Sequence, residues 1–167
     1  MKEIELSQNQ VAIVDDGDYE RLNRRNWYSV WYPSTRSYYA VGHTQMIHGK
    51  RRNISMAREI LGLKKGDGKQ ADHRNHNTLD NQRCNLRICN HQENGQNRLK
   101  NRTYAGKKCS SVYKGVCWRT RVKKWESLIE FNGNSIFIGY FDSEVEAAHA
   151  YDTGAKELFG QFANPNF

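Results

Sequence analysis

The chain has 167 residues, which is enough for one medium-sized domain or two small ones. Its net charge of +8 and isoelectric point of about 9.4 predict a polyanionic partner. No apolar run is long enough to cross a membrane and no signal peptide is recognisable, so we expect no membrane partner.

The first seventy residues predict short strands and two short helices. Met1–Gln10 is polar and is interpreted as frayed chain or an edge strand. Asp16 and Asp18 precede Tyr19–Leu22, which predicts a short capped helix. Aromatic and β-branched runs predict a strand at 11–14, a hairpin of 27–32 with 37–41, a second hairpin of 46–47 with 53–56, and a helix at 57–63 that ends near Gly62.

The next segment, 71–97, concentrates Asp, His and Asn side chains. Asp72 and His73 are adjacent, Asn85 follows His73 by twelve residues, and Asn94 follows Asn85 by nine. A histidine titrates near neutral pH and can accept a proton from water, whereas carboxylate and amide oxygens are hard ligands that suit Mg²⁺. An isolated Asp-His pair or Asn is usually part of a turn or a cap. The whole set, with its spacing, is less easily explained by turns and caps than any one of its residues.

This segment resembles the HNH nuclease motif, in the variant whose third position is Asn. The resemblance lies in Leu79–Arg83 followed by Asn85–Arg87. It implies a hairpin followed by a helix, a ββα-metal module, around one Mg²⁺ or Mn²⁺ ion. It further implies that His73 is the general base, that Asp72 and Asn94 bind the metal, and that Asn85 holds the loop and orients His73. Leu86 and Ile88 alternate in the second strand of the module, so we expect both in the core.

The segment before the motif resembles the amino-terminal part of phage and bacterial HNH homing endonucleases, where it contributes DNA contacts. Three basic residues at the predicted tip of the second hairpin suit DNA phosphates, although a solvated turn explains them almost as well: Lys50, Arg51 and Arg52. The resemblance implies a monomer that acts on double-stranded DNA in the cytoplasm of a bacterial host, encoded by the host or by a phage.

A basic connector follows the motif. Ten Lys or Arg and no acidic residue lie between Arg98 and Lys124. Such a run alone is often a solvated face or a disordered tail, but aromatic residues interrupt this one and it separates two motifs. We therefore interpret it as a strip that follows DNA phosphates. Its members in the connector are Arg98, Lys100, Arg102, Lys107 and Lys108.

The last third of the chain predicts three strands and a helix. Strands begin at Val112 and at Lys124, and Asn132-Gly133-Asn134 predicts a hairpin turn into a third strand at 135–139. Ser143 and Glu146 form the pattern of a helix capping box. The residues expected to face the sheet recur at helical spacing and are Ala147, Tyr151, Ala155, Leu158 and Phe159.

This region resembles the plant Apetala-type (ethylene-response-factor) DNA-binding domain. The matching pieces include Tyr113–Val116, Ile138–Asp142 and Ala150–Asp152. The resemblance implies a sheet that lies in the major groove of DNA. It implies DNA contacts from Lys114, Arg119, Arg121, Lys123 and Trp125, and packing is the alternative role for Trp125. Cys117, Leu128, Glu130, Ser135 and Phe137 depart from the plant pattern, so the base specificity of the plant domains is not carried over.

The expected fold is therefore α+β: an amino-terminal β-hairpin region with a ββα-metal module, then a three-stranded antiparallel sheet packed on one helix. The expected domains are residues 1–97, with the motif at 71–97, a linker at 98–110, and a DNA-binding domain at 111–167.

Three functions stay open at this point. The leading hypothesis is a site-directed DNA endonuclease of the HNH homing type, which as a monomer would nick one strand. The second is a DNA-binding regulator whose nuclease site is inactive. The third is an RNA-binding or zinc-stabilised protein; its zinc site would use Cys84 and Cys89 with His76 or His91, but the spacing is poor, and we expect reduced thiols instead.

Overall fold

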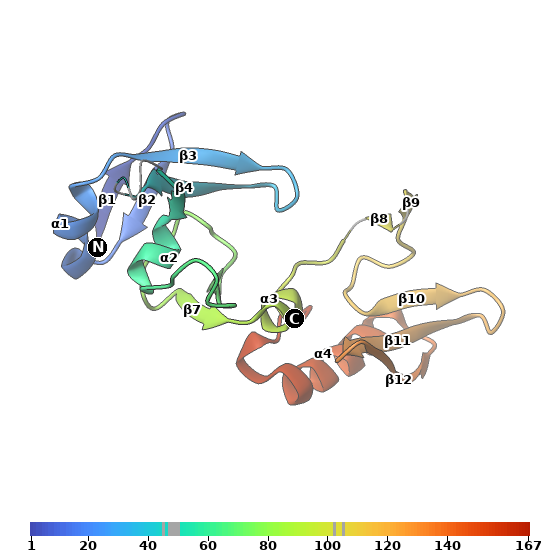
Figure 1. Cartoon of the computed structure of the whole chain (residues 1–167). Coiled ribbons are helices and arrows are strands. Elements are labelled where there is room, and N and C mark those ends of the chain that lie inside the picture. Colours follow the sequence, from blue (N-terminus) through green and yellow to red (C-terminus); the bar gives the residue numbers. More distant parts are fainter. Residues whose placement is uncertain (45, 47–50, 102, 105) are drawn as a thin grey trace. The chain divides into compact units, whose positions relative to one another are not determined.

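A computed structural model describes residues 1–44, 46, 51–101, 103–104 and 106–167. These residues form an α+β protein, in which most strands lie in small antiparallel sheets joined by short helices (Figure 1). The chain divides into two compact units, residues 1–91 and 92–167. No helix among the described residues is long and apolar enough to cross a membrane.

The first unit contains three small antiparallel sheets and two short helices. Strand β1 pairs with β2, strands β3, β4 and β5 form a second sheet, and β6 pairs with β7. The elements are β1 Lys2–Glu5, β2 Val11–Val14, α1 Asp16–Asn23, β3 Trp27–Tyr32, β4 Ser37–His43, β5 Asn53–Ser55, α2 Met56–Ile60, β6 Gln70–His73 and β7 Leu86–Cys89. Helix α3, His91–Gln96, crosses the boundary between the units.

One hydrophobic core serves the whole first unit. It includes Val14 from β2, Leu22 from α1, Met56 from α2 and Leu86 from β7, all almost fully buried. Since apolar burial is the main favourable contribution to folding, the β6–β7 hairpin is held on the amino-terminal strands rather than standing alone.

Backbone hydrogen bonds also fix the loop between β6 and β7 to the amino-terminal strands. The Ile13 amide donates to the Leu79 carbonyl at 2.9 Å, and the Asn81 amide donates to the Ile13 carbonyl at 2.8 Å. The Thr78 hydroxyl donates to the Tyr38 carbonyl. The loop that carries the motif is thereby held at a defined position in the first unit.

The second unit is a three-stranded antiparallel sheet with one helix. Strand β11 pairs with both neighbours and α4 packs against the sheet, while a separate short pair, β8–β9, precedes it. The elements are β8 Thr103–Tyr104, β9 Lys107–Lys108, β10 Val116–Arg119, β11 Lys124–Phe131, β12 Asn134–Phe141, α4 Glu144–Phe159 and the 3-10 turn η1 Gly160–Phe162.

Local chemistry explains the turns of this unit. Asn132 and Gly133 both have positive φ, the conformation that a tight two-residue hairpin requires. The Ser143 side chain accepts from the Glu146 amide and caps α4 as predicted. At Gly115 a β-carbon would lie 1.9 Å from the Tyr151 ring, so only glycine allows β10 to approach the helix.

A buried carboxylate closes the end of the second unit. Asp152 is 3 % exposed and accepts hydrogen bonds from the Asn166 and Phe167 amides at 2.7 and 2.9 Å. The Asn166 side chain in turn accepts from the Lys114 amide at 2.7 Å. The last residues of the chain are therefore part of the folded unit.

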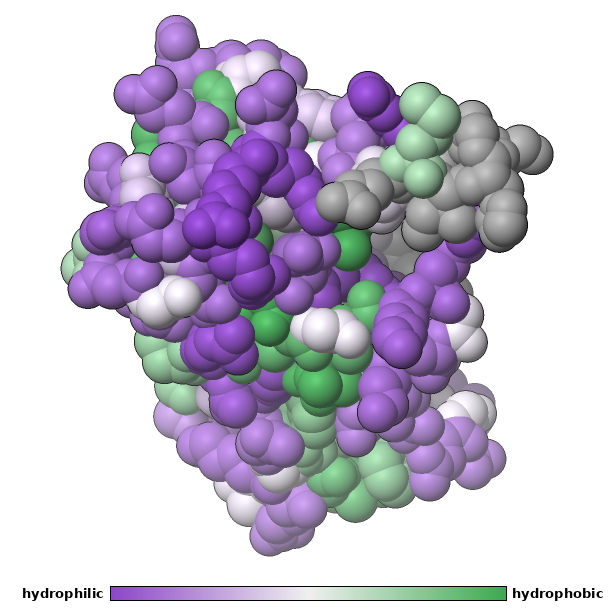
Figure 2. All heavy atoms as spheres, turned by 60° about the vertical axis from the view of Figure 1, so that its left-hand side comes forward, coloured by the Kyte–Doolittle hydropathy of each residue, from purple (hydrophilic) through white to green (hydrophobic). Residues whose placement is uncertain are grey.

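Several sequence-based predictions of the fold need correction. The first strand of the three-stranded sheet begins at Val116 rather than at Val112. Helix α2 spans Met56–Ile60 rather than 57–63. Strand β5 pairs with β4 rather than with 46–47, and residues 47–50 of that predicted hairpin lie outside the described part. Ile88 is 44 % exposed although Leu86, on the same face of β7, is buried, and Leu158 is 36 % exposed at the margin of α4. Figure 2 shows that hydrophilic residues cover most of the face in view, which agrees with a mean hydropathy of −0.92.

Candidate functional site

The centre of the motif is a contact between two buried side chains, His73 and Asn81. They are 6 % and 2 % exposed, and His73 Nε2 lies 3.3 Å from Asn81 Oδ1. The Asn81 amide nitrogen donates to the Leu79 carbonyl at 3.2 Å, which orients its oxygen toward the imidazole. Neutral His73 therefore donates from Nε2, and its lone pair is on Nδ1.

Burial lowers the pKa of His73 below the usual 6.5. The hydrogen bond that His73 donates to Asn81 and the charges of Asp72 and Asp80 oppose this effect without cancelling it. The imidazole is consequently neutral at pH 7, which is the form that can take a proton.

Asp72 is neighbour to His73 in β6 and forms a buried ion pair. It stands opposite Arg87 in the β6–β7 register, and Arg87 Nε and Nη2 each lie 2.7 Å from Asp72 Oδ2. Both side chains are less than a tenth exposed. The guanidinium compensates the buried carboxylate and fixes its orientation.

Asn85 has a different role from Asn81. Its Oδ1 accepts from the Asn75 amide at 3.0 Å and its Nδ2 donates to the Asp80 carbonyl at 2.7 Å. Asn85 therefore holds the loop, as predicted from the resemblance. The His73 ring contacts Asn81 and Tyr39, and the orientation of the ring by Asn85 stays a prediction.

A second set of charges holds the outer end of the loop. Arg83 Nε and Nη2 donate to the two carboxylate oxygens of Asp18 at 2.7 and 2.9 Å, and the Arg83 amide donates to Asp15 at 2.7 Å. The hydrogen bond from Arg83 lowers the pKa of Asp18, although burial opposes it. Helix α1 and Asp15, the residue before it, thus supply the carboxylates that anchor the motif.

Sequence reasoning missed the functions of Asn81, Arg87 and Asp18. Asn81 and Arg87 stand inside the segments that carry the resemblance, so their position in the motif was a signal. Their partners are distant in the sequence or on the neighbouring strand, so only the fold shows these contacts.

Asn94 lies on α3 within the second unit and is partly buried. Its role as a metal ligand stays a prediction. Among the described residues no group of three or more His, Cys, Asp or Glu could hold a metal ion, so Cys84, Cys89, His76 and His91 do not form the zinc cluster of the alternative hypothesis. The metal ligands predicted from the motif, the carboxylate of Asp72 and the side-chain amide of Asn94, are not a group of three such residues, so this finding does not bear on them.

Most of the predicted DNA-contacting residues in the described part are exposed. Lys50 and Arg102 lie outside the described residues, and Lys107 is described by its backbone alone. Lys100 is partly buried. The exposed members are Arg51, Arg52, Arg98, Lys108, Arg119, Arg121 and Lys123.

Lys114 does not face outward as predicted. Its Nζ donates to the carbonyls of Gln96 and Arg98 at 2.6 and 2.8 Å, and burial lowers its pKa to about 8. Lys114 therefore connects two segments of the second unit: the start of the three-stranded sheet region and the chain at the end of α3.

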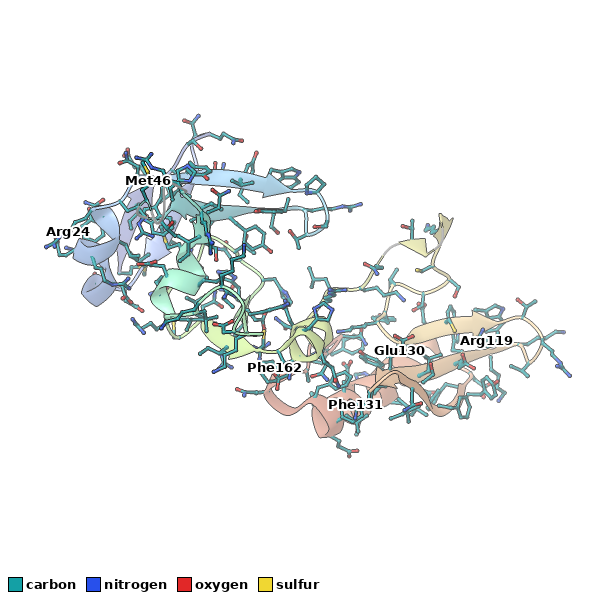
Figure 3. The ribbon with its side chains drawn as sticks, in the orientation of Figure 1. Arg24, Met46, Arg119, Glu130, Phe131 and Phe162 are labelled. Atoms are coloured by element: carbon teal, nitrogen blue, oxygen red, sulfur yellow. The ribbon has the colours of Figure 1, made fainter. Side chains whose placement is uncertain are left out.

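Trp125 lies in an apolar environment. It packs against the cluster of Val116, Ala147 and Ala148 beneath the helix, so its packing alternative describes its environment. Arg119, at the end of β10 (Figure 3), lies on the other side of the sheet and bonds Glu126, with Nε 2.6 Å from Oε2. Arg121 and Lys123, in the following turn, are exposed.

Comparison with known proteins finds similarity to two kinds of protein. The chain is 36% identical over 95 residues to an uncharacterised HNH endonuclease of Acanthamoeba polyphaga mimivirus, which covers 57% of this chain and 46% of the viral protein. It therefore spans less than half of that relative. No family model and no solved structure matches.

The second similarity is to plant transcription factors. The chain is 41% identical over 58 residues to the AP2-like ethylene-responsive transcription factor TOE2 of Arabidopsis thaliana, which covers 35% of this chain and 12% of that protein. It is 40% identical over 57 residues to dehydration-responsive element-binding protein 2A of Oryza sativa subsp. indica, which covers 34% of this chain and 21% of that protein. The chain is thus distantly similar to an HNH endonuclease and to AP2-type proteins.

Proposed function

We propose that the protein is a metal-dependent DNA endonuclease of the HNH homing type. The observation that carries this proposal is the buried, neutral His73, held by Asn81 beside the carboxylate of Asp72. A general base needs a fixed ring and an unprotonated nitrogen, and this environment supplies both. The similarity to a viral HNH endonuclease supports the same function.

Each residue of the proposed site has its own role in hydrolysis. His73 takes a proton from the water that attacks the phosphorus atom, and Asn81 keeps the ring in the tautomer that can do so. Asp72 and Asn94 would hold the Mg²⁺ or Mn²⁺ ion; their oxygens are of the type that these ions bind, and Arg87 holds Asp72 in one orientation. The ion, when bound, supplies a Lewis acid that stabilises charge on the phosphate.

Target binding would come from the exposed basic residues. Lys and Arg on the connector and on the β10–β11 turn suit phosphate contacts, which give affinity without reading sequence. With one motif per chain, a monomer would nick one strand.

A specific observation favours a second function, a DNA-binding regulator without nuclease activity. Arg87 already compensates the charge of Asp72. The chain is also similar to a plant AP2-like transcription factor, and we propose that it binds DNA through that similar region. In that case the motif would serve only to stabilise the first unit.

Cleavage of supercoiled plasmid separates the two functions. Wild type and His73→Ala are incubated with plasmid that carries candidate host DNA, with Mg²⁺, with Mn²⁺ and with EDTA. We expect nicked plasmid only with wild type and a metal ion. Salt-sensitive binding without cleavage under either metal, on DNA that contains the bound site, would establish the regulator instead.

A further inference from the structure

A hollow of about 190 Å³ lies on the β3–β4–β5 sheet of the first unit, and no part of the proposed mechanism uses it. Its walls are two aromatic rings, one aliphatic side chain and three hydroxyl side chains: Tyr32, Tyr39, Val41, Ser34, Thr35 and Ser55. The rings of Tyr32 and Tyr39 meet edge to face with centroids 5.2 Å apart. The hollow therefore offers aromatic and hydroxyl groups together.

Its size restricts what it can hold. Sites for drug-sized molecules usually have volumes of about 300–1,000 Å³. A hollow below this range suits one planar ring system rather than a whole cofactor. Aromatic walls stack on such a ring whatever its substituents, and hydroxyl groups can both donate and accept hydrogen bonds at its edge.

The hollow adjoins the proposed nuclease centre through Tyr39. The Tyr39 ring lies edge-on to the His73 imidazole, with centroids 6.3 Å apart and planes at 73°. Tyr39 is therefore a wall of the hollow on one side and a neighbour of the proposed base on the other. We therefore expect DNA whose phosphate lies at His73 to place a base near this hollow.

Basic residues on and beside the same sheet suit a nucleic-acid ligand. Strand β5 contributes Ser55 to the hollow, and the exposed Arg51 and Arg52 lead into β5. Arg36, at the tip of the β3–β4 hairpin, is exposed as well. Exposed guanidinium groups of this kind suit the phosphates of a bound strand.

We propose that this hollow binds one unstacked base of the DNA strand that lies at His73. The inference rests on the proposed nuclease function for the position of the DNA, but it concerns binding and not the chemical step. A base leaves its stack at lowest cost when it is already unpaired, so a protein with such a subsite prefers DNA that contains an unpaired base.

Adjacent residues of β3 provide a matched pair of variants. Tyr32 lines the hollow, whereas Trp31 points to the opposite face of the strand, where it contacts Tyr38. Their exposures are similar, 44 % and 46 %, so neither substitution removes a core residue. Tyr32→Phe keeps the stacking ring and serves as the conservative variant.

The experiment measures binding of the full-length chain to two 30-base-pair duplexes in EDTA, one fully paired and one with a single-base bulge. We expect wild type, Trp31→Ala and Tyr32→Phe to bind the bulged duplex roughly tenfold more tightly than the paired one, and Tyr32→Ala to bind both alike. Equal preference in wild type and Tyr32→Ala, no preference in wild type, or an equal loss in Trp31→Ala would overturn the proposal.

Plasmid cleavage by the same proteins with Mg²⁺ keeps the two proposals apart. Cleavage without a bulge preference would leave the nuclease standing and remove the base subsite. If the preference for the bulged duplex depended on Tyr32 but no protein cleaved the plasmid, the base subsite would be supported and the proposed nuclease activity would be wrong.

Discussion

The two units of this protein use charged residues in opposite ways. In the first unit the charged pair of the motif, Asp72–Arg87, is buried, and the neutral His73 beside it is hydrogen-bonded to Asn81. In the second unit the basic residues of the β10–β11 turn are exposed, and Arg121 and Lys123 reach solvent. Buried pairs hold geometry and respond strongly to a single change, whereas exposed charges act on a partner and respond weakly.

The largest effect is expected at the buried ion pair. Arg87→Met leaves the Asp72 carboxylate buried without compensation, and we expect a loss of about 3–5 kcal/mol in the free energy of unfolding. Urea denaturation measures it. The double variant Asp72→Leu/Arg87→Met should recover most of the stability but none of the cleavage. A double variant that still cleaves would remove Asp72 from the site.

The next effect is expected at Asn81. Asn81→Leu keeps the volume but removes the acceptor for His73, so the ring loses its fixed orientation. We expect cleavage at saturating DNA to fall by roughly 10–100-fold, with a loss of about 1–3 kcal/mol in stability. Single-turnover cleavage separates this from binding. Asn85→Ala is the comparison variant. If Asn85→Ala slowed the chemical step as much as Asn81→Leu does, and without loss of stability, Asn85 would be the residue that orients the His73 ring.

The pH dependence of cleavage should follow His73. Its pKa is below 6.5 because the ring is buried, so the neutral base is the main form above pH 6.5. We expect a level cleavage rate from pH 6.5 upward and a decline below it. The stability changes in the same direction, because the unfolded chain binds the proton more readily, so stability present above pH 6.5 is lost as the pH falls. A rate that continued to rise tenfold per pH unit above pH 7 would exclude His73 as the base.

A smaller effect is expected at the exposed turn. Arg121→Ala together with Lys123→Ala removes two exposed charges from the second unit, and we expect weaker DNA binding and a salt dependence reduced by about two units of slope. Binding titrations at several salt concentrations measure both. Lys156→Ala, at the end of α4, removes one charge elsewhere in the same unit and should leave binding nearly unchanged.

The smallest effect is expected inside the second unit. The Ser127 hydroxyl is fully buried and has no hydrogen-bond partner among the described residues. Ser127→Ala removes this unsatisfied group, so we expect thermal stability to stay equal or to increase slightly. A clear loss of stability would mean that the hydroxyl has a partner, such as a buried water molecule.

Sequence alone predicted the features that depend on near neighbours. The hairpin at Asn132-Gly133 and the Ser143 cap were predicted because each is decided by two or three adjacent residues. The adjacency of Asp72 and His73 was likewise visible in the sequence.

Features that depend on distant residues were missed or wrong. Ile88 was expected in the core from its alternation with Leu86, but it is 44 % exposed, whereas Arg87 on the other face of β7 is buried and pairs with Asp72. Asn81 contacts His73 because the loop is bonded to Ile13 in β2, a contact 68 residues away in sequence. Lys114 was counted with the DNA-facing charges, yet it is held by the carbonyls of Gln96 and Arg98.

The most direct test of the account measures binding and cleavage in the same samples. Wild type, His73→Ala and the Arg121→Ala/Lys123→Ala variant are titrated with plasmid in Mg²⁺, and bound and nicked DNA are quantified together. We expect His73→Ala to bind like wild type and to cleave at least about 100-fold more slowly, and the double variant to bind more weakly but to cleave at the wild-type rate once DNA is saturating. Wild-type cleavage by His73→Ala would contradict the assignment of the nuclease centre to the first unit.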